Sequence, residues 1–196
     1  MKTIEDYKVS DVISLIQEGD TVLHHNRGFL PRNIRTQMNK YSKKTYGKVP
    51  DILFNHMDTA VRKDGTIQFG GAIREGYIIR PAEEVIRPDK LLDGTQIVMR
   101  PVTPFTDEEK ERISAEALRI EVDNTPYEIW NFVWWLVYIN TNFKIFIGKK
   151  GIDKVFCYEA AWHLLQSSGR QFIYKQEQFG TSVDMQYSDY FKQVEL

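Results

Sequence analysis

The chain contains a single cysteine, Cys157, and this residue limits how the protein can be stabilised. One thiol cannot form an intramolecular disulfide or a paired-cysteine zinc site, so the fold has to rest on a hydrophobic core. Cys157 follows a short apolar segment, 154–156, and precedes a run with apolar residues at helical spacing (Ala160, Ala161, Leu164 and Leu165). The pattern predicts a helix that begins at Cys157 and ends at the glycine cap of residues 167–169.

A thiol at the start of a helix has two interpretations. It lies near the positive end of the helix dipole and near unpaired backbone N–H groups, and both favour the reactive thiolate. A lone cysteine before a helix is also commonly a small buried hydrophobic residue. Glu159, in the first turn, is explained as an acid that complements the dipole. The other residues of the chain have to distinguish the two interpretations.

Length and composition indicate one globular domain, residues 1–196. Of the 196 residues, 42% are apolar, which is enough for one full core. The net charge of -1 gives no overall attraction to nucleic acid or to an anionic membrane. The N-terminal residues lack the apolar core of a signal peptide, so we expect a cytosolic protein; a cell-wall substrate would then require lysis, as for a phage-encoded protein. The pattern calls for no cofactor or metal and leaves the oligomeric state open.

No transmembrane segment is expected. The most apolar stretch, 129–139, is far shorter than the about 20 residues that a spanning helix needs. Its tryptophans, Trp130, Trp134 and Trp135, are interpreted as core residues of a buried helix. The alternative is a hydrophobic substrate wall or a partner surface.

The hydrophobic pattern predicts an α+β fold in which an antiparallel sheet packs against helices. Helical spacing is seen near the N-terminus, around 34–41, at 82–86, and after the capping box of Thr106 and Glu109. The predicted strands are 21–25, 51–61, 66–72, 76–81 and 96–101, with a hairpin turn at 63–65. The tail from Gln171 shows no clear period.

A histidine could activate the thiol, and the chain has four. His24 and His25 are adjacent on a strand, so at most one points into a site. His163 lies six residues after Cys157, on the far side of the helix. His56 lies on an apolar strand. A cysteine at a helix start that faces such a histidine is the geometry of a cysteine hydrolase, and a hydrogen-bonded core histidine is the alternative.

Four stretches, taken in order, resemble the permuted papain-like hydrolases of the YiiX/YaeF type. These are relatives of the NlpC-type peptidoglycan hydrolases and, more distantly, of the lecithin:retinol acyltransferases. Residues 18–23 resemble the opening "GDIVL" strand, and 55–61 resemble the "SHVGI" strand with its catalytic histidine. Residues 100–127 resemble the family's "R-P", helix and "G-x-x-Y-D" run, and 156–160 resemble "F-C-S-E-L", which carries the nucleophile.

The resemblance covers about residues 18–166 and implies a circularly permuted papain-like fold with a C-terminal extension, 171–196. It implies that Cys157 is the nucleophile and His56 the general base. In the family a glutamate downstream of the histidine orients the ring, but no acid occurs in 68–72. The candidates for this role are Gln68, Glu75 and Asp58; Asp58 shares the face of His56 but lies about 7 Å along the strand. Tyr127, Asp58 and Tyr158 are the expected substrate-binding residues.

Three functions follow. The first is a cysteine hydrolase or acyltransferase that acts on an amide or ester of a small molecule, a peptide (including peptidoglycan-type peptides) or a lipid. The second is a degenerate member of the fold that serves as a binding module, which the glycines in place of the acid favour and the retained cysteine and histidine oppose. The third, a nucleic-acid binder, rests on a local basic stretch alone and is not expected (Arg27, Arg32, Arg35, Lys40, Lys43 and Lys44).

Overall fold

The computed structural model describes residues 9–127, 155–173 and 180–195, with the isolated positions 133, 137 and 141; the side chains of 29–31 are not described. Trp130, Trp134 and Trp135 lie outside the described residues. Among the helices that are described, none is long and apolar enough to cross a membrane.

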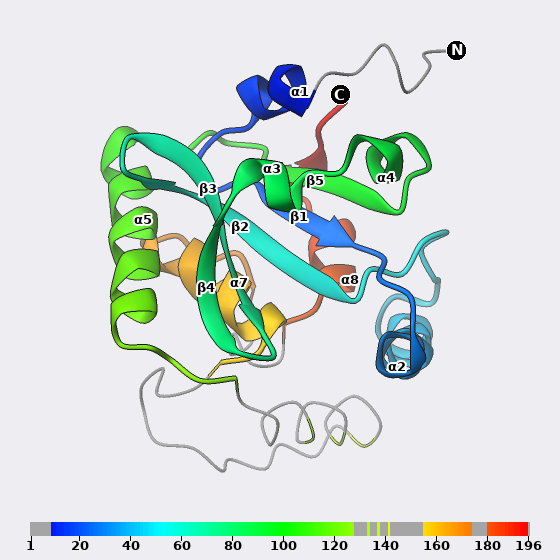
Figure 1. Cartoon of the computed structure of the whole chain (residues 1–196). Helices are drawn as coiled ribbons and strands as arrows, with labels where there is room; N and C mark the ends of the chain where they lie inside the picture. Colours follow the sequence, from blue (N-terminus) through cyan, green and yellow to red (C-terminus); the bar gives the residue numbers. More distant parts are fainter. Residues whose placement is uncertain are drawn as a thin grey trace.

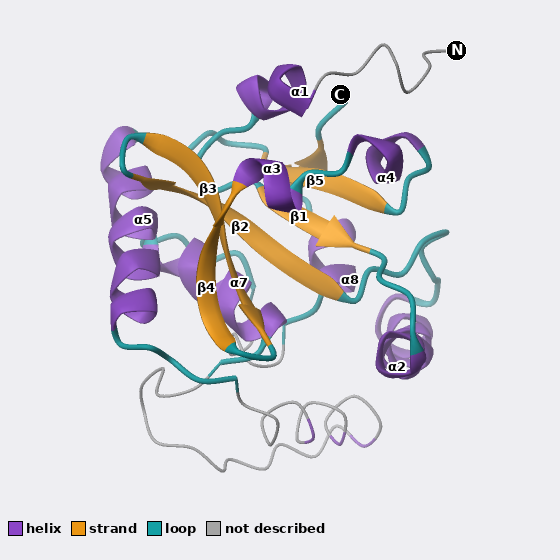
Figure 2. Cartoon of the chain, in the orientation of Figure 1, coloured by secondary structure: helices purple, strands orange, loops and turns teal. Residues whose placement is uncertain are grey.

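One antiparallel sheet runs through the molecule, in the strand order β4-β3-β2-β1-β5-β6 (Figures 1 and 2). The strands are β1 Thr21–His24, β2 His56–Lys63, β3 Thr66–Ile73, β4 Gly76–Pro81, β5 Gln96–Pro101 and β6 Phe191–Gln193. The expected hairpin joins β2 to β3 through Asp64 and Gly65, both at positive φ. The expected α+β architecture is confirmed.

The helices lie on both sides of this sheet. They are α1 Val9–Leu15, α2 Phe29–Tyr46, α3 Ala82–Val85, α4 Pro88–Leu92, α5 Asp107–Val122, α7 Cys157–Ser167 and α8 Ser182–Gln186. Helices α5 and α7 pack against each other and against β2, while α1 and α3 cover another part of the sheet (Figure 1). The α5 capping box is present as predicted, with the Thr106 hydroxyl and the Glu109 carboxylate each accepting from the other's backbone N–H.

Alternation along the strands divides the buried residues between two cores. Leu23 and Val61 belong to the larger core, with residues of α2, α5 and α7. Their chain neighbours Val22 and Ala60 belong to the smaller core under α1 and α3. Successive side chains of a strand point to opposite faces of the sheet. A sheet covered on both faces therefore needs apolar residues at odd and at even positions of its strands.

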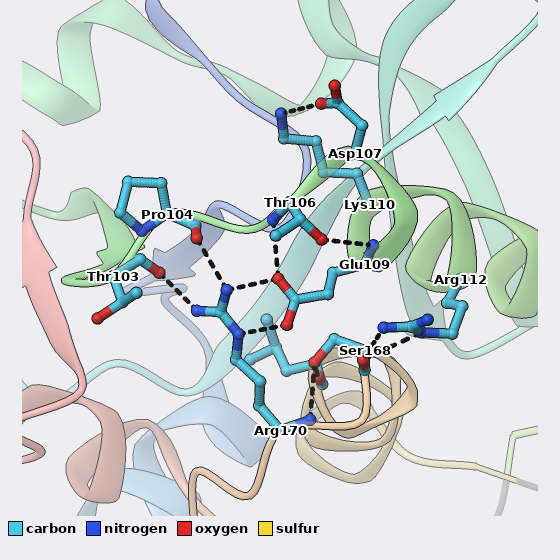
Figure 3. A network of polar contacts seen from close by, with 10 residues as sticks. Thr103, Pro104, Thr106, Asp107, Glu109, Lys110, Arg112, Ser168 and Arg170 are labelled. Atoms are coloured by element: carbon cyan, nitrogen blue, oxygen red, sulfur yellow. Dashed lines mark hydrogen bonds and ion pairs between the residues drawn. The ribbon is translucent and has the colours of Figure 1, made fainter.

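Both ends of α7 are tied to other elements, which fixes the position of Cys157. At the C-terminal end, Arg170 donates to the Glu109 carboxylate and to the carbonyls of Thr103 and Pro104 (Figure 3). Arg112 of α5 donates to the Ser168 carbonyl (Figure 3). At the other end, the Val155 N–H donates to the Pro126 carbonyl at 3.1 Å, and the Tyr158 hydroxyl donates to the Phe54 carbonyl at 2.9 Å.

The C-terminal residues contribute to the sheet rather than lying outside the domain. Strand β6 pairs with β5 in the register Met99↔Gln193. Asp184 in α8 is buried and accepts hydrogen bonds from the Tyr41 and Tyr46 hydroxyls, each at 2.7 Å. The described C-terminal residues, 180–195, are therefore packed into the same domain as the sheet.

Candidate active site

Three elements bring potentially reactive side chains to one cavity of about 790 Å³. Strand β1 ends at His24, and β2 begins at His56, which is paired with His24 across the sheet. Helix α7 begins at Cys157. All three residues line the cavity. The helix that begins at Cys157 and the strand that begins at His56 therefore meet at this cavity.

Asn55 determines where β2 begins. Its side chain is buried and exchanges two hydrogen bonds of 2.9 Å with the backbone of Asn26, while its N–H donates to the His24 carbonyl. These bonds hold the chain leaving β1 against the chain entering β2. The expected strand from Asp51 is consequently shorter, and its first residue, His56, lies at the cavity.

Cys157 is the first residue of α7 and is 7% exposed. The residue before it, Phe156, is extended and provides no side-chain cap to the helix. The Cys157 side chain is hydrogen-bonded to the His56 imidazole. The thiol is thus enclosed but faces both a base and the positive end of a helix.

Asp58 is the centre of a buried cluster of polar groups. Its Oδ2 lies 2.9 Å from His24 Nε2 and 3.2 Å from His56 Nε2, and Arg80 donates to its Oδ1 at 2.9 Å. The two histidine contacts are close ion pairs without the alignment of a linear hydrogen bond. Asp58 and His56 share a face as expected, and the imidazole spans the separation along the strand.

The pKa values in this cluster diverge. Burial lowers the pKa of His56, but the charge and hydrogen bond of Asp58, with the contact to Cys157, outweigh it and raise this pKa to about 10. Burial raises the pKa of Asp58, but the adjacent His56 and His24 hold it well below its usual range. Burial lowers the pKa of His24. At neutral pH the cluster therefore contains an ionised Asp58, a protonated His56 and a neutral His24.

Gln96 determines which nitrogen of His24 carries the proton. The Gln96 Oε1 accepts from the Arg87 N–H at 2.9 Å, and its Nε2 donates to the Val85 carbonyl at 2.8 Å, so the amide orientation is set. The same Nε2 lies 3.0 Å from His24 Nδ1, which must therefore be the acceptor. The proton of neutral His24 is then on Nε2, facing Asp58.

Gly71 leaves room for the Asp58 carboxylate. A Cβ added at Gly71 would lie 1.8 Å from Asp58 Oδ1. The two glycines of β3 were interpreted above as the loss of an acid. The structure instead places an acid from the neighbouring strand into the space that Gly71 leaves open.

Replacing Gly71 with alanine should displace Asp58. Because the added methyl overlaps the carboxylate, we expect a loss of about 1–3 kcal/mol in the free energy of unfolding. We also expect alkylation of Cys157 by iodoacetamide at pH 6 to slow at least tenfold. Urea unfolding and mass spectrometry measure the two effects. An alkylation rate equal to that of the wild type would show that Asp58 does not act through its present position.

Gln68 and Glu75 are placed away from the cluster. Gln68 Nε2 donates to the Lys63 carbonyl and the Thr66 hydroxyl within the hairpin. Glu75 is exposed in the turn between β3 and β4. Neither is among the described residues that line the cavity.

The other residues selected from the sequence fall into two groups. Tyr127 and Tyr158, the two tyrosines predicted to bind substrate, line the cavity with Asp58. His25 contacts the Leu53 carbonyl, and His163 contacts Glu116 at 2.6 Å, so each has a partner outside the cluster, as the spacing predicts. The contributions of His24, Arg80 and Gln96 are not predictable from the sequence pattern, because they depend on pairing between distant strands.

No family model matches the sequence, and no curated protein matches it. Among solved structures, the chain resembles the crystal structure of the metalloprotein yiiX from Escherichia coli O157:H7, with a TM-score of 0.57. The match covers 91% of this chain and 96% of that one. The chain has a YiiX-like fold. At 15% identity the likeness is one of fold, and the chemistry of the site has to be argued from its own residues.

Proposed function

We propose that this protein is a circularly permuted papain-like cysteine hydrolase or acyltransferase that acts on an amide or ester bond. Its expected substrates are a peptidoglycan-type peptide, another amide or a lipid ester. The observation that supports the proposal is the position of His56, which contacts Cys157 on one side and the buried Asp58 carboxylate on the other. Nucleophile, base and orienting acid arranged in this order are the constellation of a catalytic triad.

The reactive form is the ion pair in which the Cys157 thiol proton has already passed to His56, in keeping with the protonated imidazole described above. Since His56 Nε2 faces Asp58, Nδ1 is the atom that accepts this proton. The thiolate attacks the substrate carbonyl, and the positive end of the α7 dipole stabilises the oxyanion of the tetrahedral intermediate. His56 then protonates the departing amine or alcohol, which leaves a thioester on Cys157. Water or a second acceptor, deprotonated by His56, attacks the thioester and releases the thiol.

Asp58 takes the orienting role for which Gln68 and Glu75 were candidates. It is fully buried and is held by Arg80 and by His24, whose proton Gln96 directs towards it. A carboxylate held on three sides keeps the imidazole in one orientation and stabilises the imidazolium that forms. Asp58 would thereby make this site a triad rather than a dyad.

The printed description of yiiX as a metalloprotein does not fit the donors of this cavity. Within the described part of the chain, no three His, Cys, Asp or Glu side chains are arranged to hold a metal ion. The Asp58 carboxylate is taken up by His24, His56 and Arg80. We therefore derive no step through a metal.

Trapping of an acyl-enzyme tests the proposal. With p-nitrophenyl acetate at pH 7, we expect a burst of p-nitrophenol and one added acetyl group, located on Cys157 by peptide mass spectrometry. The adduct should be absent in Cys157→Ala and should form at the wild-type rate in His163→Gln, since His163 pairs with Glu116 outside the site. Acetylation of surface lysines without labelling of Cys157 would overturn the proposal in favour of the binding module.

A further inference from the structure

The cavity that contains Cys157 is lined by an excess of basic side chains. The cations among its described lining residues are Arg74, Arg80, Arg87 and Lys90. The acids are Asp58, which is already held by Arg80 and two histidines, and the exposed Glu84. The chain as a whole has a net charge of -1, so this local excess is not a property of the overall composition.

Three of these cations are free to bind a ligand. Arg80 is committed to Asp58. By contrast, no carboxylate of the described residues lies within ion-pair distance of Arg74, Arg87 or Lys90. Arg87 and Lys90 stand together at the start of α4, and Arg74 stands in the turn after β3. The free cations therefore approach the thiol from two walls of the cavity.

Part of the remaining lining is apolar. Ile34, Ile73, Val85 and Phe156 contribute hydrophobic surface beside the thiol. A cavity of about 790 Å³ is within the range that encloses a small molecule or the end of a longer one. Its chemistry suits a ligand with an apolar part and a negative charge.

We propose that the substrate carries an anionic group, a carboxylate or a phosphate, that Arg74, Arg87 and Lys90 attract to the cavity while the scissile carbonyl lies at Cys157. This inference rests on the proposed function and narrows its substrate class. Positive side chains around a concave site raise the local concentration of anions and the rate at which they enter, and salt weakens the effect. Arginine and lysine bind both carboxylate and phosphate groups.

Two alkylating reagents of nearly equal size test the charge directly. Iodoacetate is anionic and iodoacetamide is neutral, and both alkylate a thiolate. We expect the ratio of their rates at Cys157 to fall about tenfold when Arg74, Arg87 and Lys90 are all replaced by glutamine. Because His56 is retained in this variant, its attraction for iodoacetate cancels in the comparison. In wild type the ratio should also fall when 0.5 M NaCl is added.

The control removes the same three charges elsewhere. Arg32, Lys43 and Lys44 are exposed on α2 and do not line the cavity, so their replacement by glutamine should leave the ratio unchanged. Glutarate and glycerol phosphate, added in competition, should slow the labelling of wild type, and the better competitor identifies carboxylate or phosphate as the preferred anion.

The outcomes separate this inference from the proposed function. A thiol that reacts slowly with both reagents would contradict the function itself. A reactive thiol whose rate ratio is the same in wild type and in the cavity variant would overturn the inference alone. Protection by neither anion would do the same.

Discussion

Alkylation of Cys157 by iodoacetamide at pH 6 should slow about 100-fold when His56 is replaced by glutamine. An isolated cysteine thiol, with a pKa of about 8.5, is less than about 1% ionised at pH 6. In the proposed mechanism the imidazole accepts the thiol proton, and Asp58 stabilises the resulting charge and helps to raise the pKa of His56 to about 10. Glutamine has a similar volume and can hydrogen-bond, but it cannot take a proton.

The alkylation rate of Cys157 should be measured from pH 5 to 9 in wild type, in His56→Gln and in a control variant, His163→Gln. Wild type should react rapidly well below pH 8, and the His56→Gln variant should require alkaline pH. The His163→Gln variant should follow the wild type, because His163 lies on the same helix but pairs with Glu116. Slow reaction at every pH, with no difference between wild type and His56→Gln, would show that Cys157 is a buried structural residue.

Replacing Asp58 with asparagine should cost about 3 kcal/mol in the free energy of unfolding and should also slow Cys157 alkylation at pH 6. The carboxylate is fully buried and faces Arg80, His24 and His56. Without its charge, the guanidinium and the protonated imidazole remain in a low-dielectric environment with weaker compensation. Since the pKa of Asp58 lies well below its usual range, its stabilising contribution is complete at pH 7 and declines as the pH falls below about 4.

Asp20 provides a matched comparison. It is also buried, at 1% exposure, and accepts hydrogen bonds of 2.7 and 2.8 Å from Arg100. Neither residue is among the described residues that line the cavity. Burial raises the pKa of Asp20, so its charge contributes less than that of Asp58. The Asp20→Asn variant should lower stability by a smaller amount and leave the alkylation profile of Cys157 unchanged. Urea unfolding at pH 7 and the pH–rate profile measure both variants. Equal alkylation in Asp58→Asn and Asp20→Asn would contradict an orienting role for Asp58.

Much of the local structure follows from the sequence. The helix from Cys157, the capping box at Thr106 and the hairpin at Asp64 each depend on residues within a few positions of one another. The α+β class follows from the same patterns. Periodicity, capping and turn chemistry are local properties, so they can be read without knowing which strands pair.

The choice among the three candidates for orienting His56, Gln68, Glu75 and Asp58, could not be made in this way. The resemblance places the acid downstream of the histidine, whereas the structure brings Asp58, from the same strand, to the imidazole. The signal was present in the sequence as the His56-x-Asp58 spacing, together with a glycine at position 71. This signal can be interpreted only once the strand pairing is known, because the missing Cβ of Gly71 matters only if the Asp58 carboxylate of the neighbouring strand occupies that space.

The sequence by itself therefore determined many of the elements and the position of the thiol at a helix start, and it singled out His56 as the candidate base. Tertiary structure alone decided the environment of that histidine. Asp58, His24, Gln96 and Arg80 come from four strands, and their contacts exist only after the sheet has formed in the order β4-β3-β2-β1-β5. The ionisation of a buried group is set by the charges that the fold places around it, so the protonation states of this site are a property of the assembled sheet.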